Sequence, residues 1–367
     1  PPYLNPGSKP MASIALPWNP FEQMDQLRRW QGHMLDAIGL GPLGSPARTA
    51  MKASGVTLKA YGEPGNDRPV LLLVPAPIKR AYLWDLVPWA SVVQQGLRGR
   101  LRVYLVEWDR PGPAEQAFGL AEYADRFLID CLDTIAHETG HQRAFLAGHS
   151  LGGTLAAIFS ALHPDRVQGL ILLGAPVHFG KNVGDLDRLV AASPDVRLVT
   201  PLLGNVPGSL LDAASYLASP KTFELDRWND WIQSLSDPWA LQTHLRVERW
   251  TLDESPMPQR LFEETTELLY RQDRFMRGTL EVAGGVATPG SVVAPLVTVA
   301  DRHCRVVPPE SVLPFHAAAG STSKQLLWYH RDTGVALHHV GVLVGRSAHE
   351  ELWPEIVRWI HQHSEAR

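Results

Sequence analysis

The nonapeptide FLAGHSLGG, residues 145–153, contains GHSLG, a match to the pattern G-x-S-x-G centred on Ser150. The apolar run RAFLAG (143–148) is typical of a buried strand. The stretch LGGTLAAIFSALHPD (151–165) is rich in Ala, Leu and Ile and closes near a proline, as a helix with a stop signal does. A strand, a tight turn and a helix form the context of a nucleophile elbow. We therefore interpret Ser150 as a nucleophile rather than as a solvated serine in a glycine turn.

The composition is that of an ordinary globular protein. The chain has 367 residues, of which 45% are hydrophobic and 20% charged, enough to bury one or two cores. A net charge of −4 without a dense basic cluster argues against nucleic-acid binding. Only Cys131 and Cys304 are present, so we expect no disulfide framework and a protein compatible with a reducing cytoplasm. No run of about 18 apolar residues predicts a membrane span. The start lacks a secretory signal, and the residues before Met11 resemble a linker.

Near-continuous apolar runs recur along the chain and predict buried strands. They cover residues 69–77, 101–109, 144–148, 168–177, 293–301 and 324–330. Helical patterns separate most of them, for example at 120–140. Strands that are apolar throughout and alternate with helices indicate a mainly parallel sheet covered on both faces. We therefore predict an α/β-hydrolase core formed by residues 55–178 and 291–367.

Residues 179–290 interrupt this alternation. Helical stretches such as 258–278 dominate, and an insertion of this length between two strands is too long for a loop. Four tryptophans fall in it: Trp228, Trp231, Trp239 and Trp250. We predict a helical cap, with each tryptophan more suited to a core than to an acyl pocket. Residues 1–54 form an N-terminal segment whose helix, 19–39, opens with Asn19 as N-cap. That helix suits packing better than a partner or granule surface.

A serine hydroxyl needs a base, and the base needs an orienting carboxylate. In this fold the order along the chain is serine, acid, histidine. Asp301 stands where an apolar run gives way to a loop, and His338 and His339 share a later loop before the last helix. Spacing alone does not choose between the two histidines.

The oxyanion hole should use two backbone N–H groups. Leu151, directly after the nucleophile, supplies one, and the loop 74–80 supplies the other. Ile78 is the candidate there, because Pro77 cannot donate. We expect no metal and no cofactor, since no H-x-x-x-H stands in register with a downstream carboxylate and no C-x-x-C occurs.

Several segments together resemble one family. They are PVLLLVPAPIKRAYLWDL (69–86), GHSLGGTLAAIFSALHPDRVQGLILLGAPVHF (148–179), RVERWTLDESP (246–256) and ADRHCRVVPPESV (300–312). They look like polyhydroxyalkanoate synthases of the short form, over about residues 55 to 365. The family's H-x-G tripeptide matches at His339, which selects it over His338. Its D-x-L-V-P-P aspartate matches Asp301 in a longer segment, and its A-x-x-N-R loop matches with Lys79 in place of asparagine.

One departure from that family concerns the chemistry. The synthases carry cysteine in the elbow, whereas this chain has Ser150. An oxygen ester is a less activated acyl-enzyme than a thioester, so the serine favours hydrolysis over processive polymerisation. The sequence thus predicts a serine ester hydrolase acting on hydroxyacyl esters, polyhydroxyalkanoate or its oligomers. The alternatives are a synthase-like acyltransferase that uses hydroxyacyl-CoA and a weakly active granule-binding protein. A homodimer or a granule surface is a compatible partner.

Overall fold

The computed structural model describes residues 20–62, 68–180 and 183–364. The linker-like start, Met11 and the predicted N-cap Asn19 lie outside these residues.

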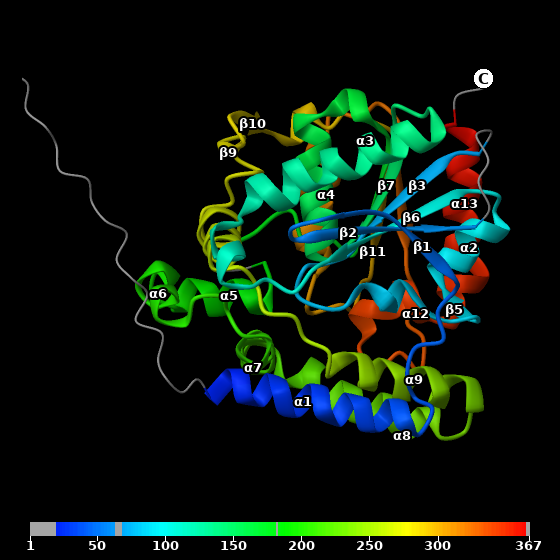
Figure 1. The fold of residues 1–367 in the computed structure, drawn as a ribbon, viewed down its shortest axis with the longest axis vertical. Coiled ribbons are helices and arrows are strands. Elements are labelled where there is room, and N and C mark those ends of the chain that lie inside the picture. The colour runs from blue at the N-terminus through cyan, green and yellow to red at the C-terminus, as the bar shows by residue number, and fades with distance from the viewer. Residues whose placement is uncertain (1–19, 63–67, 181–182, 365–367) are drawn as a thin grey trace, which may run out of the picture.

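An eight-stranded sheet forms the centre of the molecule, in the order β1-β2-β6-β3-β7-β8-β11-β12 (Figure 1). The strands are β1 Ala47–Ala53, β2 Val56–Tyr61, β3 Val70–Val74, β6 Arg102–Trp108, β7 Ala144–His149, β8 Val167–Leu173, β11 Leu296–Ala300 and β12 Lys324–Trp328. The last six in spatial order, from β6 to β12, pair in parallel, as the apolar runs predicted. β2 pairs antiparallel with both β6 and β1. These two strands extend the sheet beyond the six that the sequence predicted.

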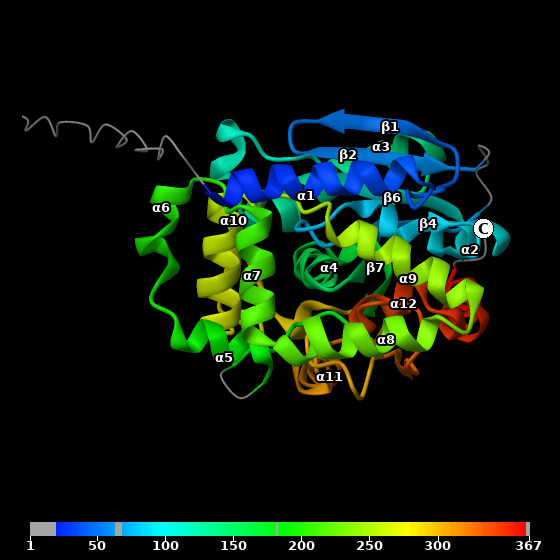
Figure 2. The ribbon, with the colours of Figure 1, turned by 90° about the horizontal axis from the view of Figure 1, so that it is seen from below.

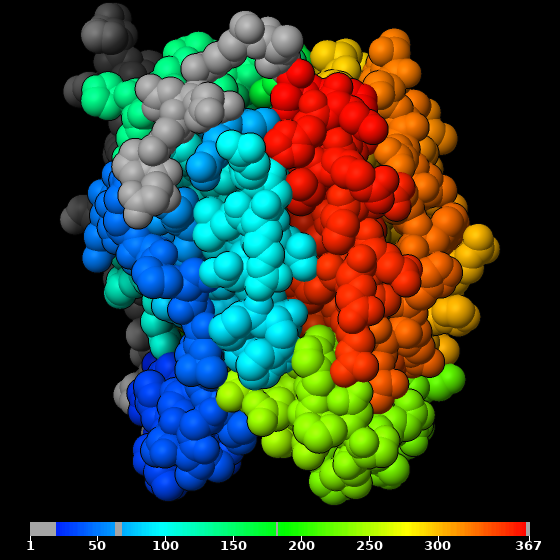
Figure 3. Space-filling view, turned by 90° about the vertical axis from the view of Figure 1, so that its right-hand side faces the viewer, coloured from blue at the N-terminus to red at the C-terminus, as the bar shows by residue number. Residues whose placement is uncertain are grey.

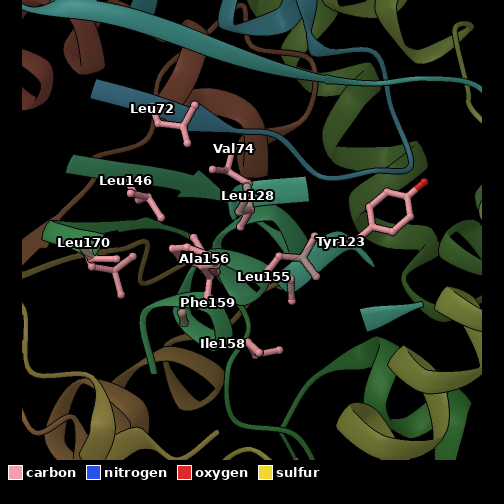
Figure 4. Close-up of a cluster of buried hydrophobic side chains, with 14 of the residues drawn as sticks. Leu72, Val74, Tyr123, Leu128, Leu146, Leu155, Ala156, Ile158, Phe159 and Leu170 are labelled. Atoms are coloured by element: carbon pink, nitrogen blue, oxygen red, sulfur yellow. The ribbon is translucent and has the colours of Figure 1, made fainter. Parts of the chain in front are cut away.

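The central strands bury both faces, which explains why their sequences are apolar throughout. Alternate residues of β3 point to opposite sides: Leu72 joins one buried cluster and Leu71 the other. On the first side, Leu72, Leu146 and Leu170 face the helix that carries Phe159 (Figure 4). Buried side chains therefore pack on both faces of β7, the strand that ends at Ser150.

The helices form two groups. Around the sheet lie α2 Val92–Arg98, α3 Phe127–Thr139, α4 Leu151–Leu162, α11 Pro309–Ala318, α12 Gly341–Val344 and α13 Trp353–Gln362. Below it in Figure 1 or to its lower left lie α1 Pro20–Ala37, α5 Asp185–Ala192, α6 Thr200–Leu203, α7 Gly208–Ala218, α8 Arg227–Ser234 and α9 Pro238–Thr251, with α10 Gln259–Glu264 seen beside α7 in Figure 2. The π-helix η3, Glu122–Arg126, leads directly into α3, and the π-helix η7, Thr265–Arg271, directly follows α10. Each pair forms one of the longer helical stretches expected from the sequence.

The helix α1 packs on the cap helices α7 and α9 rather than on the sheet (Figure 2). Asp25 accepts hydrogen bonds from the backbone N–H groups of Gly208 and Ser209 at the start of α7, at 3.2 and 2.7 Å. Asp36 pairs with Arg249 of α9 through two contacts of 2.7 Å. Figure 3 shows the N-terminal segment and the α8–α9 segment together below the core. α1 is thus a packing helix of the cap.

The segment predicted as a helical cap differs from expectation in two places. A hairpin, β9 Leu280–Val282 with β10 Gly285–Ala287, contacts the core helix α4. Trp228 on α8 is 60% exposed, against the expectation of a buried tryptophan, because its helix lies at the surface of the cap. Trp250 is buried, as expected for a core residue, but it also lines a cavity between the cap and the core.

Candidate active site

Ser150 stands at a sharp turn between β7 and α4. Its φ of +54° and ψ of −135° place a non-glycine residue in a backbone region that L-residues rarely adopt. A Cβ on Gly152 would collide with the backbone of Val74 and Pro75, and one on Gly148 with the backbone of Gly153. The turn therefore has the strained, close-packed geometry that a nucleophile elbow requires.

A cavity of about 180 Å³ lies over this turn, between the core and the cap. Ser150, Leu151 and His339 line it on the core side. Apolar side chains of both parts close much of the rest: Leu83, Trp84, Leu186, Leu211, Phe223, Trp250, Val306, Leu337 and Leu343. The space suits a short acyl group, and its lining next to the serine is mostly apolar.

His339 is buried and lines the same cavity as Ser150. Its Nε2 has no hydrogen-bond partner among the described residues, and its Nδ1 lies 3.6 Å from Sγ of Cys304. Its ring lies 4.6 Å from the ring of His149, whose Nε2 contacts the backbone O of His339 at 2.9 Å. Burial, with a smaller contribution from His149, holds the pKa of His339 well below its usual range. The imidazole is thus neutral near pH 7, the state that a general base needs.

The neighbouring His338 has a different environment. Its Nε2 accepts a hydrogen bond of 2.8 Å from Nε of Arg331, and it is not among the residues that line the cavity. His339, and not His338, therefore lines the same cavity as Ser150, although no hydrogen bond joins the two among the described residues.

Asp301 directly follows β11 and is buried. Its Oδ1 accepts a hydrogen bond of 2.8 Å from the N–H of His303, and its Oδ2 has no partner among the described residues. Within that part of the chain, no hydrogen bond or ion pair joins Asp301 to His339. Instead Cys304 occupies the Nδ1 side of the imidazole, and burial raises the pKa of this thiol to about 12. Two members of the predicted triad meet at the cavity, and the third lies in the adjoining turn with a free carboxylate oxygen.

The candidate oxyanion groups are both at the cavity wall. Leu151 begins α4, so its N–H belongs to the first turn of a helix. Ile78 lines the cavity, and its carbonyl accepts a hydrogen bond of 3.3 Å from Ser255 of the cap. Ala76 lines it as well and stands between two prolines that carry no N–H. Ala76 is therefore a second candidate that the sequence argument passed over.

A buried charge cluster beside Ile78 was not foreseen. Lys79 donates to Oε1 of Glu254 at 3.0 Å, and Arg28 of α1 donates to the same oxygen at 2.7 Å. Arg28 also pairs with Asp212 at 3.1 Å. Burial lowers the pKa of Lys79 and raises that of Glu254, while each partner's charge opposes the shift. The only signal in the sequence was Lys79 itself, in the place of an asparagine.

The sequence HETGH at 137–141 matches a zinc-binding pattern, H-E-x-x-H, that the sequence argument did not weigh. α3 ends at Thr139, and Gly140 turns the chain with φ of +76°, so the second histidine leaves the helix. Glu138 binds Arg48 instead. Among the described residues no cluster of His, Cys, Asp or Glu has the arrangement of a metal site.

Comparison with known proteins places this site in context. A family model described as alpha/beta hydrolase fold matches residues 69–197. The chain is 26% identical to the poly(3-hydroxyalkanoate) polymerase subunit PhaC of Allochromatium vinosum, over 93% of this chain and 96% of that protein. The chain therefore has an α/β-hydrolase fold and is similar to poly(3-hydroxyalkanoate) polymerase subunits over most of its length. Both the fold class and the resemblance predicted from the sequence are confirmed.

Other relatives show how far this likeness extends. The PhaC subunit of Haloarcula marismortui is 26% identical over 85% of this chain, but the match spans only 64% of that longer protein. Among solved structures, the monoacylglycerol lipase of Paleococcus ferrophilus superposes with a TM-score of 0.54 at 16% identity, covering 86% of this chain and 100% of that chain. This second likeness shows the α/β-hydrolase fold alone. No helix in the described residues is both long and apolar enough to cross a membrane.

Proposed function

We propose that this PhaC relative transfers 3-hydroxyacyl groups from a thioester to a hydroxyl acceptor through an acyl-enzyme on Ser150. The observation that carries the proposal is a strained serine in an apolar cavity under a cap, in a chain whose relatives are polymerase subunits along almost its whole length. The sequence alone favoured hydrolysis. The names of the relatives favour transfer. The mostly apolar lining of the cavity also favours transfer, because it would limit access of water to the acyl-enzyme.

In the proposed mechanism, Oγ of Ser150 attacks the thioester carbonyl while Nε2 of His339 takes the hydroxyl proton. The N–H of Leu151 and one N–H of the loop after β3 stabilise the oxyanion. The C–S bond then breaks and the protonated His339 returns the proton to the leaving thiolate. In the second half, His339 takes the proton of the acceptor hydroxyl, whose oxygen attacks the ester carbonyl. The bond between the acyl carbon and Oγ of Ser150 then breaks, and the protonated His339 returns the proton to Oγ.

The role of Asp301 requires a small rearrangement. Its free Oδ2 and the unpaired imidazole would complete the triad if the Cys304 thiol moved from the Nδ1 side of His339. Contacts of this kind tighten when substrate binds, so their absence without substrate does not conflict with the proposal.

Ester hydrolysis is the second candidate, and the serine supports it. Ser150 stands where the synthase family carries cysteine, and its oxygen ester is a weaker donor to a second hydroxyl than a thioester is. If water enters the cavity, the acyl-enzyme releases free hydroxy acid. A depolymerase or esterase would then share every residue of the mechanism except the acceptor.

The deciding experiment is product analysis after incubation with 3-hydroxybutyryl-CoA. Oligomer or polymer with free coenzyme A supports transfer, and free 3-hydroxybutyrate alone supports hydrolysis. Ser150→Ala is the blank, and Ser150→Cys should shift the ratio of products towards oligomer if the oxygen ester limits transfer. Absence of turnover of both this thioester and short p-nitrophenyl esters would refute both enzymatic candidates and leave the granule-binding alternative.

A further inference from the structure

The Nδ1 side of the His339 imidazole is occupied by a sulfur atom. Sγ of Cys304 lies 3.6 Å from Nδ1, and the same sulfur accepts a hydrogen bond of 3.4 Å from the backbone N–H of Val307. The hydrogen bond that one ring nitrogen makes decides which nitrogen carries the proton. When Nδ1 donates to Sγ, Nε2, which has no partner among the described residues, keeps the lone pair that a base for Ser150 needs.

Asp301 is engaged elsewhere in the turn that carries Cys304. Its Oδ1 accepts a hydrogen bond of 2.8 Å from the N–H of His303, and its backbone O accepts one of 3.4 Å from the N–H of Cys304. Within the ranges that the structure describes, no hydrogen bond or ion pair joins its carboxylate to His339. The turn therefore presents the sulfur of Cys304, and not the carboxylate, to the imidazole.

The spacing in the sequence gives the same assignment independently. The pattern D-x-L-V-P-P, counted back from Pro308 and Pro309, places its V at Val307 and its first position at Cys304. No insertion is needed, whereas Asp301 fits the pattern only in a longer segment. The cysteine thus stands at the aspartate position of the pattern and, in space, on the side of the imidazole where a triad has its acid.

The thiol is not placed to attack a substrate. Cys304 is buried and, unlike Val306 and Val307, is not among the residues that line the cavity with Ser150. Burial raises the pKa of the thiol to about 12, so the thiol stays neutral near pH 7. A neutral sulfur can accept a hydrogen bond from the imidazole, but it stabilises an imidazolium less than a carboxylate does.

We infer that Cys304 is the positioning residue of His339, with its sulfur at Nδ1 in the place of the carboxylate of a Ser-His-Asp triad. This inference rests on the proposed function, because it names the group that orients the base for Ser150. The thiol keeps its place during turnover, and Asp301 remains a residue of the turn. Because the partner of the imidazole is neutral, the pKa of His339 stays low and the base is weaker than in a complete triad.

The kinetic test compares the two candidate partners of His339, with 3-hydroxybutyryl-CoA and a short p-nitrophenyl ester as substrates. Cys304→Ala should lower kcat about tenfold and leave KM within about twofold, because the ring loses its orientation while the cavity keeps its lining. Cys304→Ser should recover most of that loss, since its hydroxyl also accepts from Nδ1. Asp301→Asn should lower kcat less than Cys304→Ala does. The matched control is Cys131→Ala, which removes the buried thiol of α3.

The opposite order of the two losses would overturn the inference. A loss of about 10²-fold or more in Asp301→Asn, with Cys304→Ala near the wild type, would show that the carboxylate replaces the thiol when substrate binds. An equal loss of kcat in Cys304→Ala and Cys131→Ala would also overturn it, because the thiol would then act only through packing.

A titration without turnover separates this inference from the proposed function. Nuclear magnetic resonance of the histidine rings measures the pKa and the tautomer of His339, whose signals are identified by their absence in His339→Ala. In the wild type the proton of the neutral ring should be on Nδ1. Cys304→Asp, which places a carboxylate there, should raise the pKa of His339 by about one unit or more and move the acid limb of kcat/KM to higher pH.

A neutral ring with its proton on Nε2, or a pKa of His339 that Cys304→Asp leaves unchanged, would refute the contact even if the wild-type protein transfers acyl groups. A proton on Nδ1 together with a raised pKa upholds the contact even if no ester or thioester is turned over. The tautomer is measured on the wild type, so this test does not depend on whether Cys304→Asp folds.

Discussion

Lys79, in the loop that supplies an oxyanion group, and Glu254, after the cap helix α9, form an ion pair with 3.0 Å between Nζ and Oε1. Only 3% of the Glu254 side chain is exposed. Arg28 of α1 binds the same oxygen, so the core loop, the cap and the N-terminal helix meet at one carboxylate. The position of the loop next to Ser150 therefore depends on contacts with both the cap and α1.

Replacing Glu254 by glutamine should lower the free energy of unfolding by about 3 kcal/mol, because Lys79 and Arg28 lose the carboxylate that they share and keep only Asp212 as counter-charge. Denaturant titration measures the change, and Glu281→Gln, on the exposed side of β9, is the control. A loss no larger than that of the control would show that the cluster is solvated and contributes little.

Ser150→Ala should lower acyl turnover by about 10³-fold or more, since the proposed acyl-enzyme forms on the hydroxyl that this change removes. Circular dichroism and unfolding midpoints should match the wild type, because the change removes one hydroxyl. If the variant kept more than about a tenth of the activity, Ser150 would not be the nucleophile.

His339→Ala should be as damaging as the serine change, whereas His338→Ala should reduce kcat/KM only mildly. The reason is position: the first histidine lines the cavity, and the second binds Arg331 outside it. Steady-state kinetics of the two variants decide the matter. Comparable losses at both positions, or the opposite order, would mean that the wrong imidazole has been assigned.

The pH dependence of kcat/KM should have its acid limb below pH 6.5. A base works in its neutral form, activity falls as the pH drops through its pKa, and burial holds the pKa of His339 well below 6.5. The measurement is a rate profile with a p-nitrophenyl ester from pH 4.5 to pH 8, roughly spanning the titration of histidine. A limb at or above 6.5 would indicate a solvated imidazole.

The sequence predicted the six parallel strands and the elbow because each is a local pattern: an apolar run, or a glycine pair around one serine. The strands β1 and β2 were not predicted because ARTAMKA and VTLKAY mix apolar with charged and small residues, so neither forms a continuous apolar run. Such a mixture is common in an edge strand such as β1, but β2 lies between β1 and β6. The position of α1 was not predicted either. Its contacts with α7 and α9 join residues far apart in the chain, and amphipathic periodicity gives no partner.

The candidate site was accessible from the sequence to different degrees. Ser150 and His339 were found, and the structure places both at the cavity. The cluster around Glu254 could not be predicted, because ion pairing depends on side chains that only the folded chain brings together. Lys79 was noticed as a departure from a family pattern, but its partners on α1 and after α9 were not.

The attachment of α1 has a consequence for how substrate enters. Asp25, Arg28 and Asp36 tie this helix to α7, Glu254 and α9, so the lid over the serine is held from outside the insertion that forms it. Any opening of the cap must therefore move α1 with it or break these contacts. A group attached through the start of α1 would therefore be coupled to the cap, whereas one attached after α13 would be coupled to the helices that pack on the sheet.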